Sequence, residues 1–188
     1  NVRLGITFEN INDKGDSVEV TFTDGTSGEY DLVVGSDGLM SSVRTTLFPD
    51  APKPSYIGQG VWRAILPRIP EIENIHMWMG KNVKVGVNPM SKDEMYMFIT
   101  ENRADNEFIE PATFKERFIA LLESFPAPVV QQMKGMLHDK SMIHYRPLES
   151  MLMRAPWYSN RVVLIGDTVH ATTPHLASGA CIGLEDAI

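Results

Sequence analysis

Cysteine is almost absent from this sequence, which has Cys181 as its single cysteine in 188 residues. One cysteine excludes a disulfide within the chain, so we expect a reducing, cytoplasmic setting. Long apolar runs are absent as well, and none approaches the roughly 20 residues of a membrane-spanning helix. The sequence therefore predicts a cytoplasmic protein without a transmembrane segment.

Basic charge is also scarce. The chain has 17 Lys and Arg against 24 Asp and Glu, a formal net charge of -7, and no clustered basic run. A nucleic-acid surface needs a basic stripe, so we expect no nucleic-acid partner. The 43% hydrophobic and 22% charged content is typical of a globular protein with a buried core.

The chain has no initiator methionine, and its last helical pattern stops at Ile188. We therefore expect it to be an internal piece of a longer protein, whose missing N-terminal part is a required partner. A homo-oligomer is left open by the sequence.

The C-terminal stretch carries the clearest signal. The aliphatic run 162–165 predicts a buried strand. The strand ends at Gly166 and Asp167, and a polar loop with Pro174 follows. Four small residues then begin a predicted helix: Ala177, Ser178, Gly179 and Ala180. A carboxylate after a strand, next to a small-residue helix start, indicates a ligand crevice of an open α/β sheet.

A corner of the same kind occurs near the N-terminus. The pattern predicts strands over 3–10, 18–22 and 30–34, with a hairpin turn at Asp24-Gly25. The third strand leads into Asp37 and Gly38, and a serine-capped helix over 41–47 follows. We expect the corners at Gly38 and Asp167 to lie on the same edge of one sheet.

The middle of the chain predicts a different architecture. Strands over 57–66, 75–79, 83–87 and 95–100 form an antiparallel meander, followed by helices over 111–125 and 129–137 and a strand over 142–145. Alternation places Trp62 on a shared face with Gly60 and Ala64, and Tyr96 on a shared face with Phe98 and Thr100. One face of the sheet should line the substrate cavity and the other should pack on the helices. The substrate-cavity candidates are Trp62, Trp78, Tyr96 and Phe98. The methionines at 77, 79, 95 and 97 are expected to fill the core.

Two motifs carry a resemblance to a known family. The stretch 31–44 resembles the Asp-Gly motif, and 161–187 the Gly-Asp motif, of the flavin-dependent aromatic hydroxylases. These are class A flavoprotein monooxygenases of the p-hydroxybenzoate and salicylate hydroxylase type. The resemblance implies a mixed α+β and α/β fold: a Rossmann-like FAD-binding domain in two parts, 1–50 and 156–188, around an antiparallel-sheet substrate domain with helices, 51–155.

The resemblance also implies the chemistry. FAD would be the cofactor and NADH or NADPH the co-substrate, and a small aromatic or hydrophobic substrate would be hydroxylated with dioxygen through a flavin hydroperoxide. No catalytic side chain is expected, because the flavin supplies the difficult step. The family's Gly-x-Gly-x-x-Gly corner, which holds the ADP half of FAD, does not occur in these residues, so the fragment alone is expected to be inactive.

The resemblance assigns cofactor-binding residues to both corners. They are Asp37, Gly38, Arg44, Gly166, Asp167, Pro174, Ala177, Ser178, Gly179 and Ala180. The Asp167 carboxylate would accept hydrogen bonds from ribityl hydroxyls, and Gly166 would let the backbone approach the cofactor. Pro174 would line the flavin loop, and Ala177 stands where many relatives carry glycine.

Other interpretations remain open for these residues. Asp167 could cap a local turn, Asp37-Gly38 could be a structural turn, and Arg44 could only satisfy helix carbonyls. For the whole protein, the alternatives are a flavin dehydrogenase or reductase of the same fold and a non-catalytic interaction module. A further one is a metal-dependent hydrolase that uses Asp167, His170 and His175 as ligands.

Overall fold

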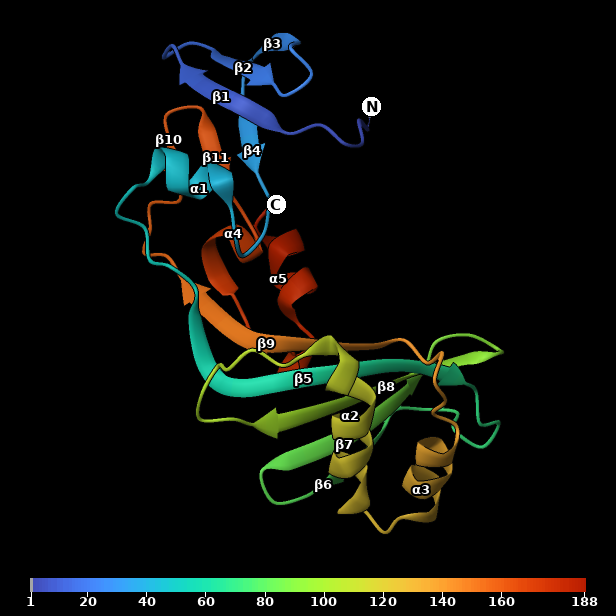
Figure 1. The fold of residues 1–188 in the computed structure, drawn as a ribbon. Coiled ribbons are helices and arrows are strands. Elements are labelled where there is room, and N and C mark those ends of the chain that lie inside the picture. The colour runs from blue at the N-terminus through green and yellow to red at the C-terminus, as the bar shows by residue number, and fades with distance from the viewer. Residues whose placement is uncertain (1) are drawn as a thin grey trace. The chain divides into compact units, whose positions relative to one another are not determined.

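The computed structural model describes residues 2–188, and their contacts form two compact units. The flanking unit comprises Asn1–Ser55 and Glu149–Ile188, and the central unit comprises Tyr56–Leu148. Both contain strands and helices, and each has a hydrophobic core of its own (Figure 1). The predicted mixed α and β fold class, with antiparallel sheets and helices, is confirmed.

A small antiparallel sheet opens the flanking unit. It has the order β1 (Phe8–Asp13), β2 (Val18–Phe22) and β3 (Ser27–Tyr30). The predicted Asp24-Gly25 turn joins β2 to β3, and Gly25 adopts a φ of 81° that favours glycine. The first strand begins at Phe8 rather than at residue 3, because the register of β1 with β2 starts with the pair Phe8 and Phe22.

The second sheet of this unit contains the two predicted corners. Its order is β10 (Tyr158–Ser159), β11 (Val162–Leu164) and β4 (Val33–Gly35), and β11 is parallel to β4. The strand predicted over 30–34 is wrong as a single element, since it is divided between β3 and β4. Arg161 accounts for the break: its guanidinium donates to the Asp31 carbonyl, and its own carbonyl accepts from the amide of Val33.

Short helices follow these strands. They are α1 (Ser42–Leu47), α4 (Asp167–His170) and α5 (Gly179–Glu185), with a 3-10 turn at Pro174–Leu176. Ser41 caps α1 as predicted, because its hydroxyl accepts from the amide of Arg44. The sequence predicted only a polar loop where α4 lies, since four residues are too few to show helical periodicity.

One five-stranded sheet forms the central unit. Its order is β6 (His76–Met79), β7 (Val83–Pro89), β8 (Glu94–Asn102), β5 (Ser55–Pro67) and β9 (Ile143–Leu152). The predicted strands are present, and β9 extends well beyond the predicted 142–145. The pairs β6–β7, β7–β8 and β5–β8 are antiparallel, as expected. The order departs from a simple meander, because β5 lies between β8 and β9 rather than beside β6.

Helices cover one face of this sheet (Figure 1). The helix predicted over 111–125 begins as a 3-10 turn, Pro111–Thr113, and continues as α2 (Phe114–Glu123); α3 (Pro128–Gly135) follows. Trp62, Met97 and Phe118 are almost completely buried between sheet and helices. We call this the helix-covered face and the opposite one the open face.

The methionines of this sheet do not all fill the core. Met95 and Met97 are fully buried on the helix-covered face, as expected. Met77 and Met79 are 56% and 75% exposed, so the expectation was wrong for them. They lie on the edge strand β6 and pair with Gly86 and Lys84, whose positions alternate with those of the core residues of β7.

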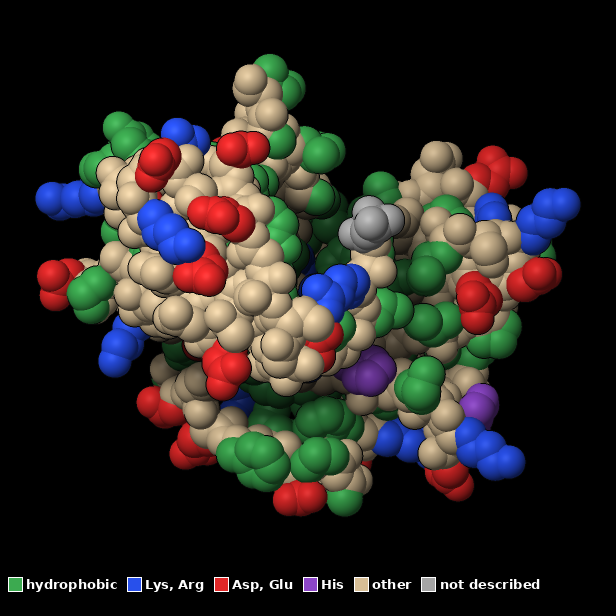
Figure 2. All heavy atoms as spheres, turned by 90° about the horizontal axis from the view of Figure 1, so that it is seen from above, with side chains coloured by type: hydrophobic (Ala, Val, Ile, Leu, Met, Phe, Trp, Pro, Cys, Tyr) green, Lys and Arg blue, Asp and Glu red, His purple; other side chains and the backbone are tan. Residues whose placement is uncertain are grey.

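On the face that Figure 2 shows, acidic and basic side chains of the described residues are interspersed. Within residues 2–188, no helix combines the length and the apolar character that crossing a membrane requires.

Candidate functional site

The two strand-to-helix corners meet in the flanking unit. β4 and β11 run in parallel and end together, with Gly35 opposite Leu164. Beyond the strand ends, the amide of Gly38 donates to the Thr168 hydroxyl at 3.1 Å. The corners therefore lie on the same edge of one sheet, which confirms the geometric expectation.

A hollow of about 560 Å³ opens at this edge. It is lined by backbone and small side chains from both corners and from the loop before α5. Seven of the predicted cofactor-binding residues line it: Gly38, Gly166, Asp167, Pro174, Ala177, Gly179 and Ala180. Ser178 precedes α5 beside them, while Asp37 and Arg44 are not in the lining.

Asp167 presents its carboxylate to this hollow. The residue is exposed, and it lies in the first turn of α4 without capping the helix. Within residues 2–188, no group hydrogen-bonds to its oxygens. Gly179 comes close, since a Cβ built there would lie 3.9 Å from Asp167 Oδ1. The carboxylate keeps its acceptor capacity for a ligand, and the capping alternative does not describe it.

Unlike that of Asp167, the carboxylate of Asp37 has hydrogen-bond partners within the described part of the chain. Its carboxylate accepts from the Ser41 hydroxyl and from the amides of Ser42, at 2.8 Å, and Val43, at 3.1 Å. These are the first amides of α1, which have no partner within the helix. The structure thus gives Asp37 the role of a helix cap, and its predicted contact with the cofactor stays a prediction.

The Arg44 side chain connects the two corners by hydrogen bonds. It is 2% exposed, and its guanidinium donates to the carbonyls of Leu39 and Thr168, both at 2.7 Å. Leu39 belongs to the first corner and Thr168 to the second, so one side chain ties both together. Arg44 therefore holds the two corners together and does not line the hollow.

Two residues that the sequence analysis did not assign complete this region. Asp186 Oδ2 accepts from the amide of Gly166 at 2.7 Å and lies 2.6 Å from Nε2 of His170. Burial would raise the pKa of Asp186, but the Gly166 amide and the His170 ring together hold it below its usual value. Sequence periodicity could not reveal this pair, because it joins α4 to α5 across the fold.

The ligand set of the metal-dependent alternative is not assembled. His170 pairs with Asp186 rather than pointing to a common centre with Asp167 and His175. Across residues 2–188, no group of three or more His, Cys, Asp or Glu side chains is arranged to hold a metal ion.

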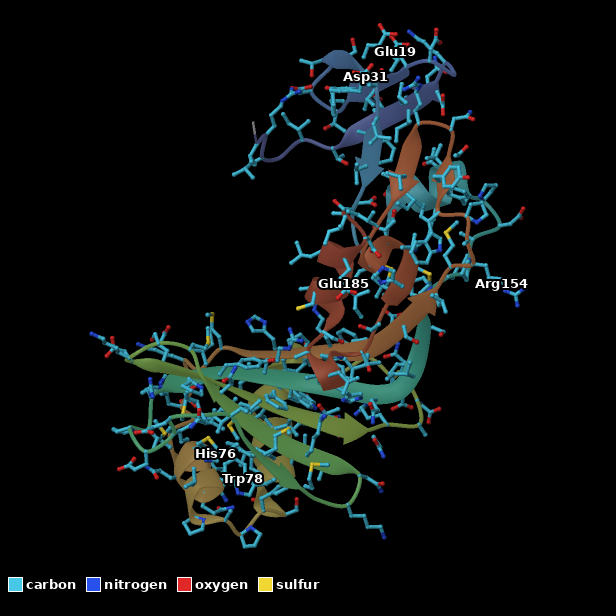
Figure 3. The ribbon with its side chains drawn as sticks, turned by 180° about the vertical axis from the view of Figure 1, so that it is seen from behind. Glu19, Asp31, His76, Trp78, Arg154 and Glu185 are labelled. Atoms are coloured by element: carbon cyan, nitrogen blue, oxygen red, sulfur yellow. The ribbon has the colours of Figure 1, made fainter. Side chains whose placement is uncertain are left out.

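The four predicted cavity aromatics lie on two faces of the central sheet. Trp62 contacts the α2 residue Phe114 at a ring-centroid distance of 5.3 Å on the helix-covered face. Trp78 packs partly against the same core, with His76 beside it on β6 (Figure 3). Tyr96 and Phe98 stack at 5.8 Å on the open face. The four rings therefore do not line one cavity.

A second hollow, of about 320 Å³, lies in the central unit beside Tyr96. Its lining combines apolar side chains, including Ile65, Met90 and Met142, with Arg63 and His144. Burial raises the pKa of the Tyr96 hydroxyl, and the nearby Arg63 charge opposes that rise. The phenol therefore remains neutral and can donate a hydrogen bond near neutral pH.

The comparison with protein families decides the assignment. The whole chain, residues 1–188, matches the family described as FAD binding domain. The chain belongs to this family. The predicted resemblance to FAD-dependent aromatic hydroxylases is confirmed.

Individual relatives agree with this assignment. The chain is 34% identical, over 99% of its length, to 2-heptyl-3-hydroxy-4(1H)-quinolone synthase of Pseudomonas aeruginosa, and covers 49% of that protein. It is 29% identical to Aurachin C monooxygenase/isomerase of Stigmatella aurantiaca, over all of its length and 49% of the relative. The chain thus spans about half the length of the curated relatives it matches.

Solved structures show the same fold. The structure of HpxO from Klebsiella pneumoniae, complexed with FAD and uric acid, superposes with a TM-score of 0.80 at 25% identity, covering 97% of this chain and 47% of that one. A salicylate hydroxylase substrate complex superposes with a TM-score of 0.75 at 22% identity, over 98% and 50%.

Proposed function

We propose that this chain supplies part of the FAD site and the substrate-binding sheet of an NAD(P)H-dependent monooxygenase. The observation that carries the proposal is the meeting of the two corners around a hollow that is lined by the Asp167 carboxylate, which has no partner among residues 2–188. Bound FAD would supply the redox chemistry with dioxygen. The chain would bind and orient the cofactor, and it would hold the substrate.

The residues at the hollow suit a flavin. Glycines at 38, 166 and 179 line the hollow without side chains, so a ligand can approach the backbone there. A Cβ built at Gly179 would lie only 3.3 Å from the Thr172 hydroxyl. Asp167 offers two acceptor oxygens, which match neighbouring hydroxyls of a ribityl chain. Pro174 and Ala177 form the part of the wall contributed by the loop.

For the substrate, we propose a small aromatic compound bound at the open face of the central unit. Tyr96 and Phe98 offer stacked aromatic surface, and Met90 and Met142 offer adaptable apolar contacts. The relative named for a 2-heptyl quinolone supports an aromatic ring with an apolar substituent. Trp62 and Trp78 would support this sheet from its other face.

The rest of the enzyme would come from a longer chain. We propose that the flanking unit is part of the FAD-binding domain, that the central unit is the substrate domain, and that an N-terminal part holds the ADP half of FAD. The relatives' roughly twofold greater length supports this arrangement. The free thiol of the exposed Cys181 suits the reducing cytoplasm in which we place the protein.

The decisive experiment replaces Asp167 in the full-length protein. Asp167→Ala should raise the FAD dissociation constant at least tenfold, because charge-assisted hydrogen bonds are worth about 1.5–3 kcal/mol each. The midpoint of thermal unfolding of the apoprotein should hardly change, since this carboxylate has no partner among the described residues. Flavin fluorescence during titration of the apoprotein measures the affinity.

Asp16→Ala is the matched control, because Asp16 is an exposed acid of the same unit, in the β1–β2 turn. Equal FAD affinity of both variants and the wild type would refute the assigned cofactor site. Oxygen uptake distinguishes a monooxygenase from a dehydrogenase or reductase of the same fold. A monooxygenase consumes one dioxygen for each substrate molecule that it hydroxylates.

A further inference from the structure

We infer that Asp186 is a positioning residue that holds the Gly166-Asp167 corner in the conformation required for FAD binding. The inference rests on the proposed FAD site, and it assigns a function to a carboxylate outside the lining of that site. It follows from the contacts of a single carboxylate oxygen and from the packing around it.

Asp186 Oδ2 connects the two ends of α4. It accepts from the amide of Gly166, which precedes the helix, and it lies 2.6 Å from Nε2 of His170, the last residue of the helix. Gly166 has a φ of 63°, a conformation that favours glycine. Because Gly166 directly precedes Asp167, the bond to its amide sets the direction in which the Asp167 side chain leaves the backbone.

The pair is held in place by its surroundings. The side chains of His170 and Asp186 are only 10% and 12% exposed. The His170 ring packs against Trp157 at a centroid distance of 5.4 Å, and the Trp157 indole donates to the Met153 carbonyl at 2.9 Å. His170 therefore cannot turn away from Asp186 without disturbing a packed aromatic contact.

Close backbone packing adds a second restraint. A Cβ built on Gly183 of α5 would lie 3.4 Å from the Cα of Gly166. The backbone of α5 thus lies directly against the corner, and Asp186 fastens it there through its bond to Gly166. Losing that bond would free the corner to rotate Asp167 out of the hollow, although Asp167 itself would be unchanged.

The test compares two neighbouring acids of α5 in the full-length protein. Asp186→Asn and Glu185→Gln each remove one negative charge at almost the same size, and Glu185 is an exposed residue of α5 (Figure 3). Asparagine keeps a neutral acceptor oxygen but loses the charge-assisted bonds to the Gly166 amide and to His170. We expect Asp186→Asn to raise the FAD dissociation constant of the apoprotein about tenfold, and Glu185→Gln to change it less than twofold.

A second variant separates positioning from general stability. His170→Gln leaves the bond between Asp186 and Gly166 available, so its affinity for FAD should fall between those of the wild type and Asp186→Asn. The double variant should bind no more weakly than Asp186→Asn alone, because both changes act through one carboxylate. All titrations are made at a temperature at which far-ultraviolet circular dichroism shows each apoprotein to be folded.

Equal FAD affinity of Asp186→Asn and Glu185→Gln would overturn this inference while the proposed function stands. The inference would also be overturned if the loss of FAD affinity in Asp186→Asn were fully explained by the fraction of that variant that is unfolded. If Asp186→Asn does not fold, wild-type affinity in His170→Gln would overturn it. Failure of the wild-type protein itself to bind FAD would overturn the proposed function together with this inference.

Discussion

The aspartates that follow the neighbouring strands β4 and β11 have different partners. Asp37 follows β4, and its carboxylate is occupied by the first amides of α1. Asp167 follows β11, and its carboxylate lines the hollow without a hydrogen bond from any of residues 2–188. Asp37 lies five residues before α1, so its carboxylate can accept from the first amides of that helix, whereas Asp167 is itself the first residue of α4. One carboxylate therefore stabilises the fold, and the other remains available to a ligand.

At this scale we predict the effect of Asp37→Ala. The variant loses the hydrogen bonds from the Ser42 and Val43 amides to Asp37, while the Ser41 cap remains, so the free energy of unfolding should fall by about 1–2 kcal/mol. Denaturant unfolding of the apoprotein measures the change, with Asp16→Ala as the exposed-acid control. An unaltered unfolding midpoint would show that α1 does not depend on this carboxylate.

Strand β5 shows how an element is constrained by its neighbours. Trp62 on β5 lies 4.6 Å, between ring centroids, from Tyr145 on β9. Gly60, two residues earlier on the same face, leaves room for the Tyr145 ring: a Cβ built there would lie 2.5 Å from it. Glycine at this position lets the aromatic ring lie flat over the strand.

Gly60→Ala should therefore destabilise the central sheet. We expect a loss of about 1–3 kcal/mol in the free energy of unfolding, because the added methyl group must displace a ring packed between Trp62 and Phe114. Gly135→Ala in α3 is the matched control, since a Cβ there meets nothing within 4 Å. Similar unfolding curves for the two variants would contradict this account of β5.

At the scale of the whole molecule, we propose that this chain holds only part of the FAD site and that an N-terminal part of a longer chain holds the ADP half. The isolated 188-residue chain should show no saturable FAD binding in the micromolar range, and no NADH-dependent oxygen uptake. The physical reason is that a helix-end site for the pyrophosphate normally contributes several charge-assisted contacts, each worth about 1.5–3 kcal/mol.

Fluorescence titration of the isolated chain with FAD checks this prediction, and the full-length protein is the positive control. Saturable micromolar binding by the isolated chain would show that the hollow at Asp167 is sufficient by itself.

Much of the fold could be predicted because it depends on local patterns. The strands of the central sheet and the Asp24-Gly25 turn follow from alternation and turn residues. Met77 and Met79 were misplaced because alternation gives the face of a side chain but not whether that face is covered. The break at residues 31–32 was missed because it depends on Arg161, which lies 130 residues from Asp31 in the sequence.

The sequence by itself determined the family and the two corners, because a strand, a glycine and a carboxylate in succession are local chemistry. Only the tertiary structure decided the roles of individual side chains: Asp37 as a cap, Arg44 as the link between corners, and Asp186 as the anchor of Gly166. The bonds of Arg44 and Asp186 reach residues 124 and 20 positions away, and those of Asp37 cross the turn that leads into α1. A buried donor or acceptor takes whichever partner folding brings within about 3 Å, and no local pattern encodes that choice.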